Sequence, residues 1–155
     1  ALFFVNSAIM MAVAPFIGLL IQKIGDRNAM VIQYIGLAFV FTAYAFVTVP
    51  ALAIGLYILD HAFFSLEIAK KTYFQKIATP SDIAATTGVA FTINHIAAVF
   101  LPAALGYLWL VSPSAVFLLA AAMASVSFTL ALFIPRHPCP GNETIFSNPL
   151  LKAAE

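Results

Sequence analysis

The pattern of apolar and polar positions divides the chain into five long apolar segments separated by short polar turns. A helix needs about 20 apolar residues to cross the ~30 Å hydrocarbon layer of a membrane. Each segment comes close to that length or exceeds it, and the five cover residues 2–21, 29–48, 51–74, 82–110 and 114–134. Short turns favour antiparallel neighbours in one bundle. We therefore predict an all-α membrane protein, with a bundle of five transmembrane helices at 1–134 and a C-terminal tail at 135–155.

Proline and capping residues mark the ends and bends of these segments. Thr79, Pro80 and Asp82 are typical of a helix start, because the hydroxyl caps the first turn, proline fits inside it and an acid follows the cap by three residues. Pro15 and Pro102 lie inside the first and fourth segments, where each predicts a bend. The fourth segment would be ~43 Å long as a helix and must tilt or bend to fit the bilayer.

The composition supports a membrane location and excludes several classes of function. Hydrophobic residues make up 63% of the 155 positions and charged residues 8%, whereas about a quarter of the residues of a soluble domain are charged. The net charge of +1 leaves no electrostatic footprint for nucleic acid. The single cysteine, Cys139, excludes a disulfide framework and a multi-cysteine metal site. No nucleotide or cofactor motif is present, so we expect no cofactor, no metal and no enzymatic activity.

The positive charges lie on one side of the predicted bundle. They occur between segments one and two (Lys23, Arg27), between three and four (Lys70, Lys71, Lys76) and after five (Arg136, Lys152). The other two turns contain no Lys or Arg. The positive-inside rule makes the charged side cytoplasmic, together with the C-terminal tail. We expect an integral protein of a bacterial inner (plasma) membrane.

The turn after the first segment carries a regular set of glycines and charges. It resembles the cytoplasmic signature of the major facilitator superfamily, Gly-x-x-x-Asp-Arg/Lys-x-Gly-x-Arg/Lys. Four residues fall on positions of that pattern: Gly18, Lys23, Gly25 and Arg27. The glycines allow close helix approach and a tight turn. Gln22 stands where the signature has its acid, which leaves Asp26 as the local anion.

The resemblance implies where the chain belongs in a larger fold. In this family the signature follows the second helix of each six-helix half. One degenerate copy, followed by four crossings and a cytoplasmic tail, implies helices eight to twelve of a twelve-helix transporter. Ala1 opens directly in an apolar crossing, which also points to a piece of a longer protein. The missing N-terminal half would come from upstream sequence or from a partner chain.

Polar side chains within the apolar segments form the candidate site. Asp60 lies ten residues after Pro50, ~15 Å deep, and His61 is adjacent. Asn94 and His95 lie ~18–20 Å into the fourth segment. An ionisable group at this depth is costly and marks a functional site by default, so we predict that these four residues line a substrate and proton pathway. The alternative is a polar pair that holds two helices together.

Glu67 lies near the charged end of the segment that contains Asp60. Lys70 and Lys71 follow it by three and four residues, the spacing of a helical ion pair. We therefore predict a structural ion pair at these positions.

These features predict secondary active transport of a small solute by alternating access, with coupling to protons. The partners would be the solute, the lipid bilayer and the missing half, without nucleic acid. One alternative is a non-transporting membrane assembly or delivery factor on the same fold, which Gln22 in place of the acid favours. The other is a membrane-embedded metalloenzyme, which the side chains of Asp60 and His61 disfavour because they point about 100° apart on a helix.

Overall fold

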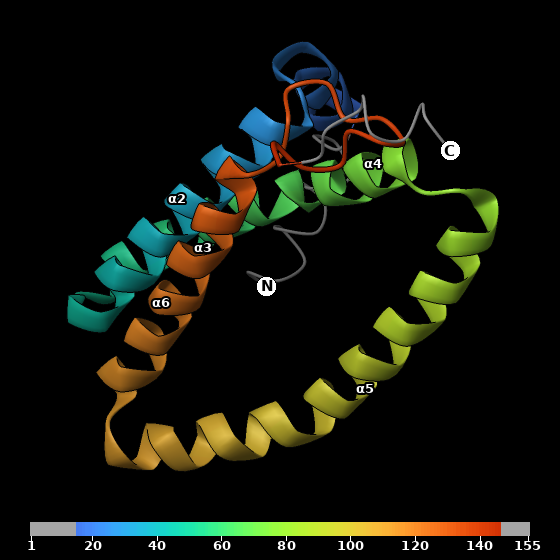
Figure 1. The fold of residues 1–155 in the computed structure, drawn as a ribbon. Helices are drawn as coiled ribbons and strands as arrows, with labels where there is room; N and C mark the ends of the chain where they lie inside the picture. Colours follow the sequence, from blue (N-terminus) through green and yellow to red (C-terminus); the bar gives the residue numbers. More distant parts are fainter. Residues whose placement is uncertain (1–14, 147–155) are drawn as a thin grey trace.

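The computed structural model describes residues 15–146, and its regular elements are helices (Figure 1). They are the helix Pro15–Ile24, α2 (Asp26–Phe46), α3 (Pro50–Phe64), the 3-10 turn η1 (Ser65–Glu67), α4 (Ile68–Ile77), α5 (Pro80–Val111) and α6 (Pro113–Leu132). Between residues 15 and 146 there is no strand. The start of the predicted segment 2–21 and the end of the predicted tail lie outside the described residues.

Within residues 15–146, four helical spans are long and apolar enough to cross a membrane. They are Asp26–Phe46, Pro50–Ile77, Pro80–Val111 and Pro113–Leu132. The second span joins α3, η1 and α4 into one continuous rod of 28 residues. The prediction of an all-α membrane protein is confirmed.

Polar capping residues and prolines mark the starts of α5 and α6. Thr79 and Asp82 form a capping box at the start of α5. The Thr79 hydroxyl accepts from the backbone N–H of Asp82 at 3.4 Å, and the Asp82 carboxylate accepts from the backbone N–H of Thr79 at 3.1 Å. Ser112 caps α6 with its hydroxyl. A proline follows each of these caps, in the first turn, where a missing N–H removes no helical hydrogen bond.

α2 is the helix around which the others are arranged. Its most extensive contact is with α6, and it also packs against α3 and α4. Several of the buried residues of these two helices are small or medium in size: Ala29 and Val40 on α2, and Ala121, Ala124 and Ala131 on α6. Lipid provides no hydrophobic drive for helices to associate, so small side chains that allow close van der Waals packing are what stabilises such a pair.

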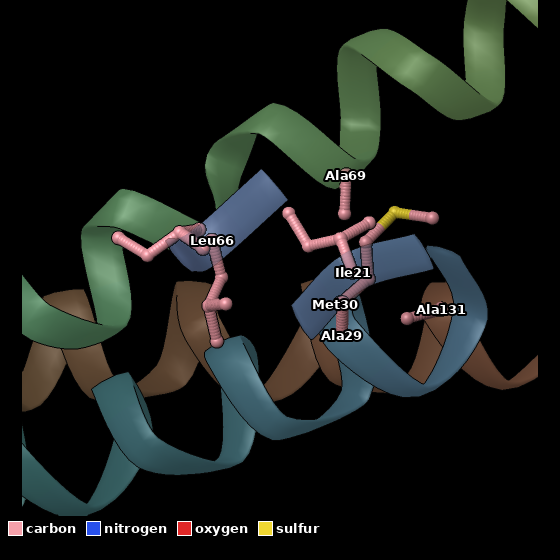
Figure 2. Packing of buried hydrophobic residues seen from close by; sticks show 7 residues of the cluster. Ile21, Ala29, Met30, Leu66, Ala69 and Ala131 are labelled. Carbon is pink, nitrogen blue, oxygen red and sulfur yellow. The ribbon is translucent and has the colours of Figure 1, made fainter. Parts of the chain in front are cut away.

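A buried cluster joins four segments at one end of the helices (Figure 2). This end carries the turn at residues 25–27, Gly25, Asp26 and Arg27, which we call the charged turn. Its members are Ile17, Ile21, Ala29, Met30, Leu66, Ala69 and Ala131. They come from the helix Pro15–Ile24, α2, the η1–α4 segment and α6. This cluster is therefore the packed core of the described residues, and it lies directly beside the turn that the sequence singles out.

α5 lies apart from α2, α3 and α4 and returns to the other helices at α6 (Figure 1). None of the 32 described residues of α5 is buried. The expected antiparallel packing of this segment against the third segment is therefore not found. α5 is apolar around its whole circumference, and such a helix needs lipid or a second protein surface to cover it. It is bent, with Pro102 inside the helix.

The contact between Gly36 on α2 and Phe63 on α3 leads to a prediction about stability. A Cβ at Gly36 would lie 2.5 Å from ring atoms of Phe63. We expect Gly36→Ala to lower the free energy of unfolding by about 1 kcal/mol, because overpacking costs ~1–3 kcal/mol and outweighs the ~1 kcal/mol that alanine gains in helix propensity. Thermal unfolding followed by circular dichroism in detergent measures the change.

Gly55→Ala is the matched control for this substitution. Gly55 is on α3, and no described atom lies within 4 Å of where its Cβ would be. We expect this variant to be neutral or slightly more stable. Equal effects of the two substitutions would contradict the observed contact between Gly36 and Phe63.

Candidate functional site

The charged turn begins with a glycine in a conformation that other residues rarely adopt. Gly25 has φ of +85°, in the left-handed region where a Cβ is strained. Its backbone N–H donates to the carbonyl of Ile21 at 2.8 Å and ends the helix Pro15–Ile24. Asp26 then begins α2. The glycine of the signature is therefore required by the backbone geometry of this turn.

Asp26 is the anion of the turn, and it is buried. Its side chain is 3% exposed. Lys76 Nζ donates to Oδ2 at 2.5 Å, and Thr72 Oγ1 donates to Oδ1 at 2.6 Å. Both donors are on α4, so the carboxylate joins the start of α2 to the last turns of α4. The helix dipole also favours a negative charge at this first residue of α2.

A second contact joins the same turn to α6. Arg27 Nη2 donates to the carbonyl oxygen of Leu132, the last residue of α6, at 3.2 Å. A cation at a helix C-terminus stabilises the carbonyls that have no partner in the helix. Together, Asp26 and Arg27 connect α2 to α4 and to α6.

The other residues of the signature take no part in these contacts. The side chains of Gln22 and Lys23 are exposed. For Gly18, no described atom lies within 4 Å of where a Cβ would be, so the close approach expected there is not found among the described residues. Sequence reasoning missed Thr72 and Lys76. Their i, i+4 spacing puts both on one face of a helix, but nothing in the sequence pairs that face with Asp26.

Asp60 and His61 lie in the middle of the rod formed by α3, η1 and α4. His61 Nδ1 is 3.6 Å from Asp60 Oδ2 and donates to the carbonyl of Tyr57 at 3.0 Å. Both side chains are partly exposed, at 30% for His61 and 24% for Asp60. His61 lines an open pocket of about 310 Å³ together with Glu67 and Lys71. Ile17, Phe64 and Ile68 complete much of its lining, so this pocket is largely apolar.

Asn94 and His95 lie on α5, away from these two residues. Both are exposed, and His95 Nδ1 donates to the carbonyl of Phe91 at 2.9 Å. Because α5 lies apart from α3, the structure does not bring Asn94 and His95 together with Asp60 and His61. A pathway formed by all four residues stays a prediction.

Glu67 interacts with one of its two predicted partners. Its Oε1 is 3.1 Å from Lys70 Nζ, one helical turn later. Lys71 is exposed and lines the pocket that also contains His61.

The four apolar spans found within residues 15–146 and the charged turn that connects three helices are those of an integral membrane protein. The chain is 33% identical, over 125 residues, to an uncharacterized MFS-type transporter of Methanocaldococcus jannaschii. The alignment covers 77% of this chain and 30% of that relative. Neither a family model nor a solved structure matches the chain. The predicted resemblance is thus confirmed: the chain is similar to part of an MFS-type transporter.

The buried carboxylate of the turn leads to a second prediction. Asp26→Asn removes the ion pair with Lys76 while nearly preserving the shape of the side chain. We expect the free energy of unfolding to fall by about 2 kcal/mol, because hydrogen bonds to a charged group contribute ~1.5–3 kcal/mol. Denaturant unfolding in detergent, followed by circular dichroism, provides the measurement.

Glu67→Gln provides the control, since it makes the same chemical change in an exposed helical pair. An exposed pair of this type contributes ~0.3–0.5 kcal/mol, so we expect a much smaller loss. Comparable losses from both variants would show that burial of Asp26 adds nothing to its interaction with Lys76.

Proposed function

We propose that the chain forms the C-terminal part, about helices eight to twelve, of a twelve-helix secondary transporter. It would move a small solute by alternating access, and it would not act as an enzyme. The observation that carries this proposal is the 33% identity to an MFS-type transporter. Secondary transporters bind their solute near the midplane and move one bundle against another around it. Since the alignment covers 30% of the relative, the remaining helices come from further sequence or from a second chain.

In this proposal Asp60 and His61 carry the coupling proton. They lie near the middle of a membrane span, where an ionisable group is costly unless it serves a function. A carboxyl group and an imidazole side by side can exchange one proton and thereby change their charge.

We assign Asn94 and His95 to the solute-facing side of α5. This role requires α5 to lie against α3 in the complete transporter, so that the four polar residues reach one level of the membrane. The unburied apolar surface of α5 supports such a contact, since it needs lipid or further helices to cover it.

The charged turn would act as the contact that holds one conformation. The ion pair of Asp26 with Lys76 and the hydrogen bond of Arg27 to Leu132 join α2 to α4 and α6, and alternating access requires contacts of this kind to break and reform. The signature has an acid where this chain has Gln22, and the loss of that acid favours a non-transporting assembly factor only if the charged turn forms no ion pair. Because Asp26 supplies one, solute flux is what separates the two functions.

The test of proton coupling is Asp60→Asn in the full-length protein. We expect this variant to lower proton-coupled uptake by roughly a hundredfold or more, which is the usual contribution of a positioned acid–base group. The protein is reconstituted in vesicles that contain a pH-sensitive dye, and sugars, amino acids and organic cations are added in turn. The readout is a solute-driven change in the pH of the vesicle interior, which falls when protons enter with the solute and rises when they leave in exchange for it.

Glu67→Gln is the matched control, because it changes a carboxylate to an amide on the same rod but close to its end. It should retain most of the flux. Flux through Asp60→Asn with unchanged pH dependence would overturn the coupling role. Failure of every solute to drive flux in the wild-type protein would favour the assembly or delivery factor.

We also propose that the basic end of the helices faces the cytoplasm, in the plasma membrane. Cys139 is free, exposed and the single cysteine of the chain, so it reports on this face directly. A membrane-impermeant maleimide is expected to label Cys139 in inverted membrane vesicles and not in intact cells. Thr48→Cys in a Cys139→Ser background, in the exposed turn between α2 and α3, should show the opposite pattern. Labelling of Cys139 in intact cells would reverse the proposed orientation.

A further inference from the structure

An open pocket of about 480 Å³ lies at the basic end of the helices, beside the charged turn. Segments that are far apart in the sequence form its walls: the end of the helix Pro15–Ile24, the start of α2, the end of α4 and the residues that follow α6. Its charged or ionisable lining residues are Lys23, Asp26, Arg27, Lys76, Arg136 and His137. We call it the basic pocket.

The basic pocket carries an excess of positive charge. Asp26 is the one acidic residue in its lining, and this carboxylate is buried and already bound by Lys76 and Thr72. Lys23 and Arg136 pair with no carboxylate among residues 15–146, and both side chains are exposed. Three cations of the pocket, counting Arg27, are therefore without a counter-charge in the described part of the chain.

Such a set of donors suits a phosphate group. The guanidinium of arginine presents a planar fork of N–H donors that matches two phosphate oxygens, and lysine adds a point charge. Basic pockets between helices at the membrane surface are typical sites for anionic lipid headgroups. The Arg27 side chain already donates to Leu132, so the two residues most available to a ligand are Lys23 and Arg136.

We propose that the basic pocket binds the phosphate group of an anionic ligand through Lys23 and Arg136. The ligand is a phospholipid headgroup or a free phosphate, and the two sources share this chemistry. A bound phosphate bridges Lys23 at the end of the helix Pro15–Ile24 and Arg136 in the segment after α6. The proposal is independent of solute transport, since it rests only on the shape and charge of this pocket.

The test measures binding to the full-length protein in neutral detergent. The two probes are a short-chain phosphatidylglycerol and inorganic phosphate, each titrated by calorimetry at low salt. Lys23→Gln/Arg136→Gln removes the proposed contacts and is expected to weaken binding by about thirtyfold. Lys70→Gln/Lys71→Gln removes the same charge from the same end of the protein but outside the pocket, and it should weaken binding less than about threefold. Lys23→Arg/Arg136→Lys keeps the charges and is expected to restore most of the affinity.

The outcomes distinguish the sources of the phosphate. Saturable binding of phosphatidylglycerol that depends on Lys23 and Arg136 establishes a lipid site, and the same dependence for inorganic phosphate establishes a site for a free anion. Equal weakening by the two double variants would show that the charged face attracts anions without a site, and this would overturn the proposal. If neither probe binds saturably, the proposal is overturned as well. Circular dichroism of each variant confirms that its helices are retained.

Discussion

The structure depends on the burial of a single carboxylate, that of Asp26. A charged group removed from water is costly unless it is paired and its oxygens accept hydrogen bonds. Lys76 and Thr72 satisfy both oxygens of Asp26, and they can do so only when the end of α4 lies against the start of α2. The ion pair thus determines the register of these two helices, and the apolar cluster of Figure 2 packs directly beside it.

This interaction also connects the two parts of the candidate site. Asp60 and Lys76 are on one rod, sixteen residues apart along α3, η1 and α4, which corresponds to ~24 Å of helix. The proposed proton site and the contact that holds the charged turn are therefore at the middle and the end of the same rod. In the proposed transport cycle, separation of Lys76 from Asp26 would release the end of this rod from α2. The rod changes to a 3-10 turn at η1, between the two sites, and such a turn within a helix often marks a hinge.

The position of α5 is not determined by packing against the helices around α2. The helices around α2 bury small residues against one another, while α5 buries none of its own residues. Apolar surface of this kind is stable in lipid or against further helices, but it does not select a neighbour by itself. The place of Asn94 and His95 relative to the rod is therefore decided by whatever covers α5 in the complete protein.

The apolar segments, their ends and the all-α membrane class follow from the sequence alone, because hydropathy, prolines and capping residues such as Thr79 act locally. The position of Asp60 within its apolar segment and the basic character of one end follow from it as well. The sequence could not show that Asp26, rather than Gln22, forms the ion pair of the turn, since Thr72 and Lys76 are about fifty residues away and only the packing of α4 on α2 brings them within hydrogen-bonding distance. The tertiary structure alone likewise assembled the basic pocket and separated α5 from α3. Both depend on contacts between distant segments, which no local pattern of residues encodes.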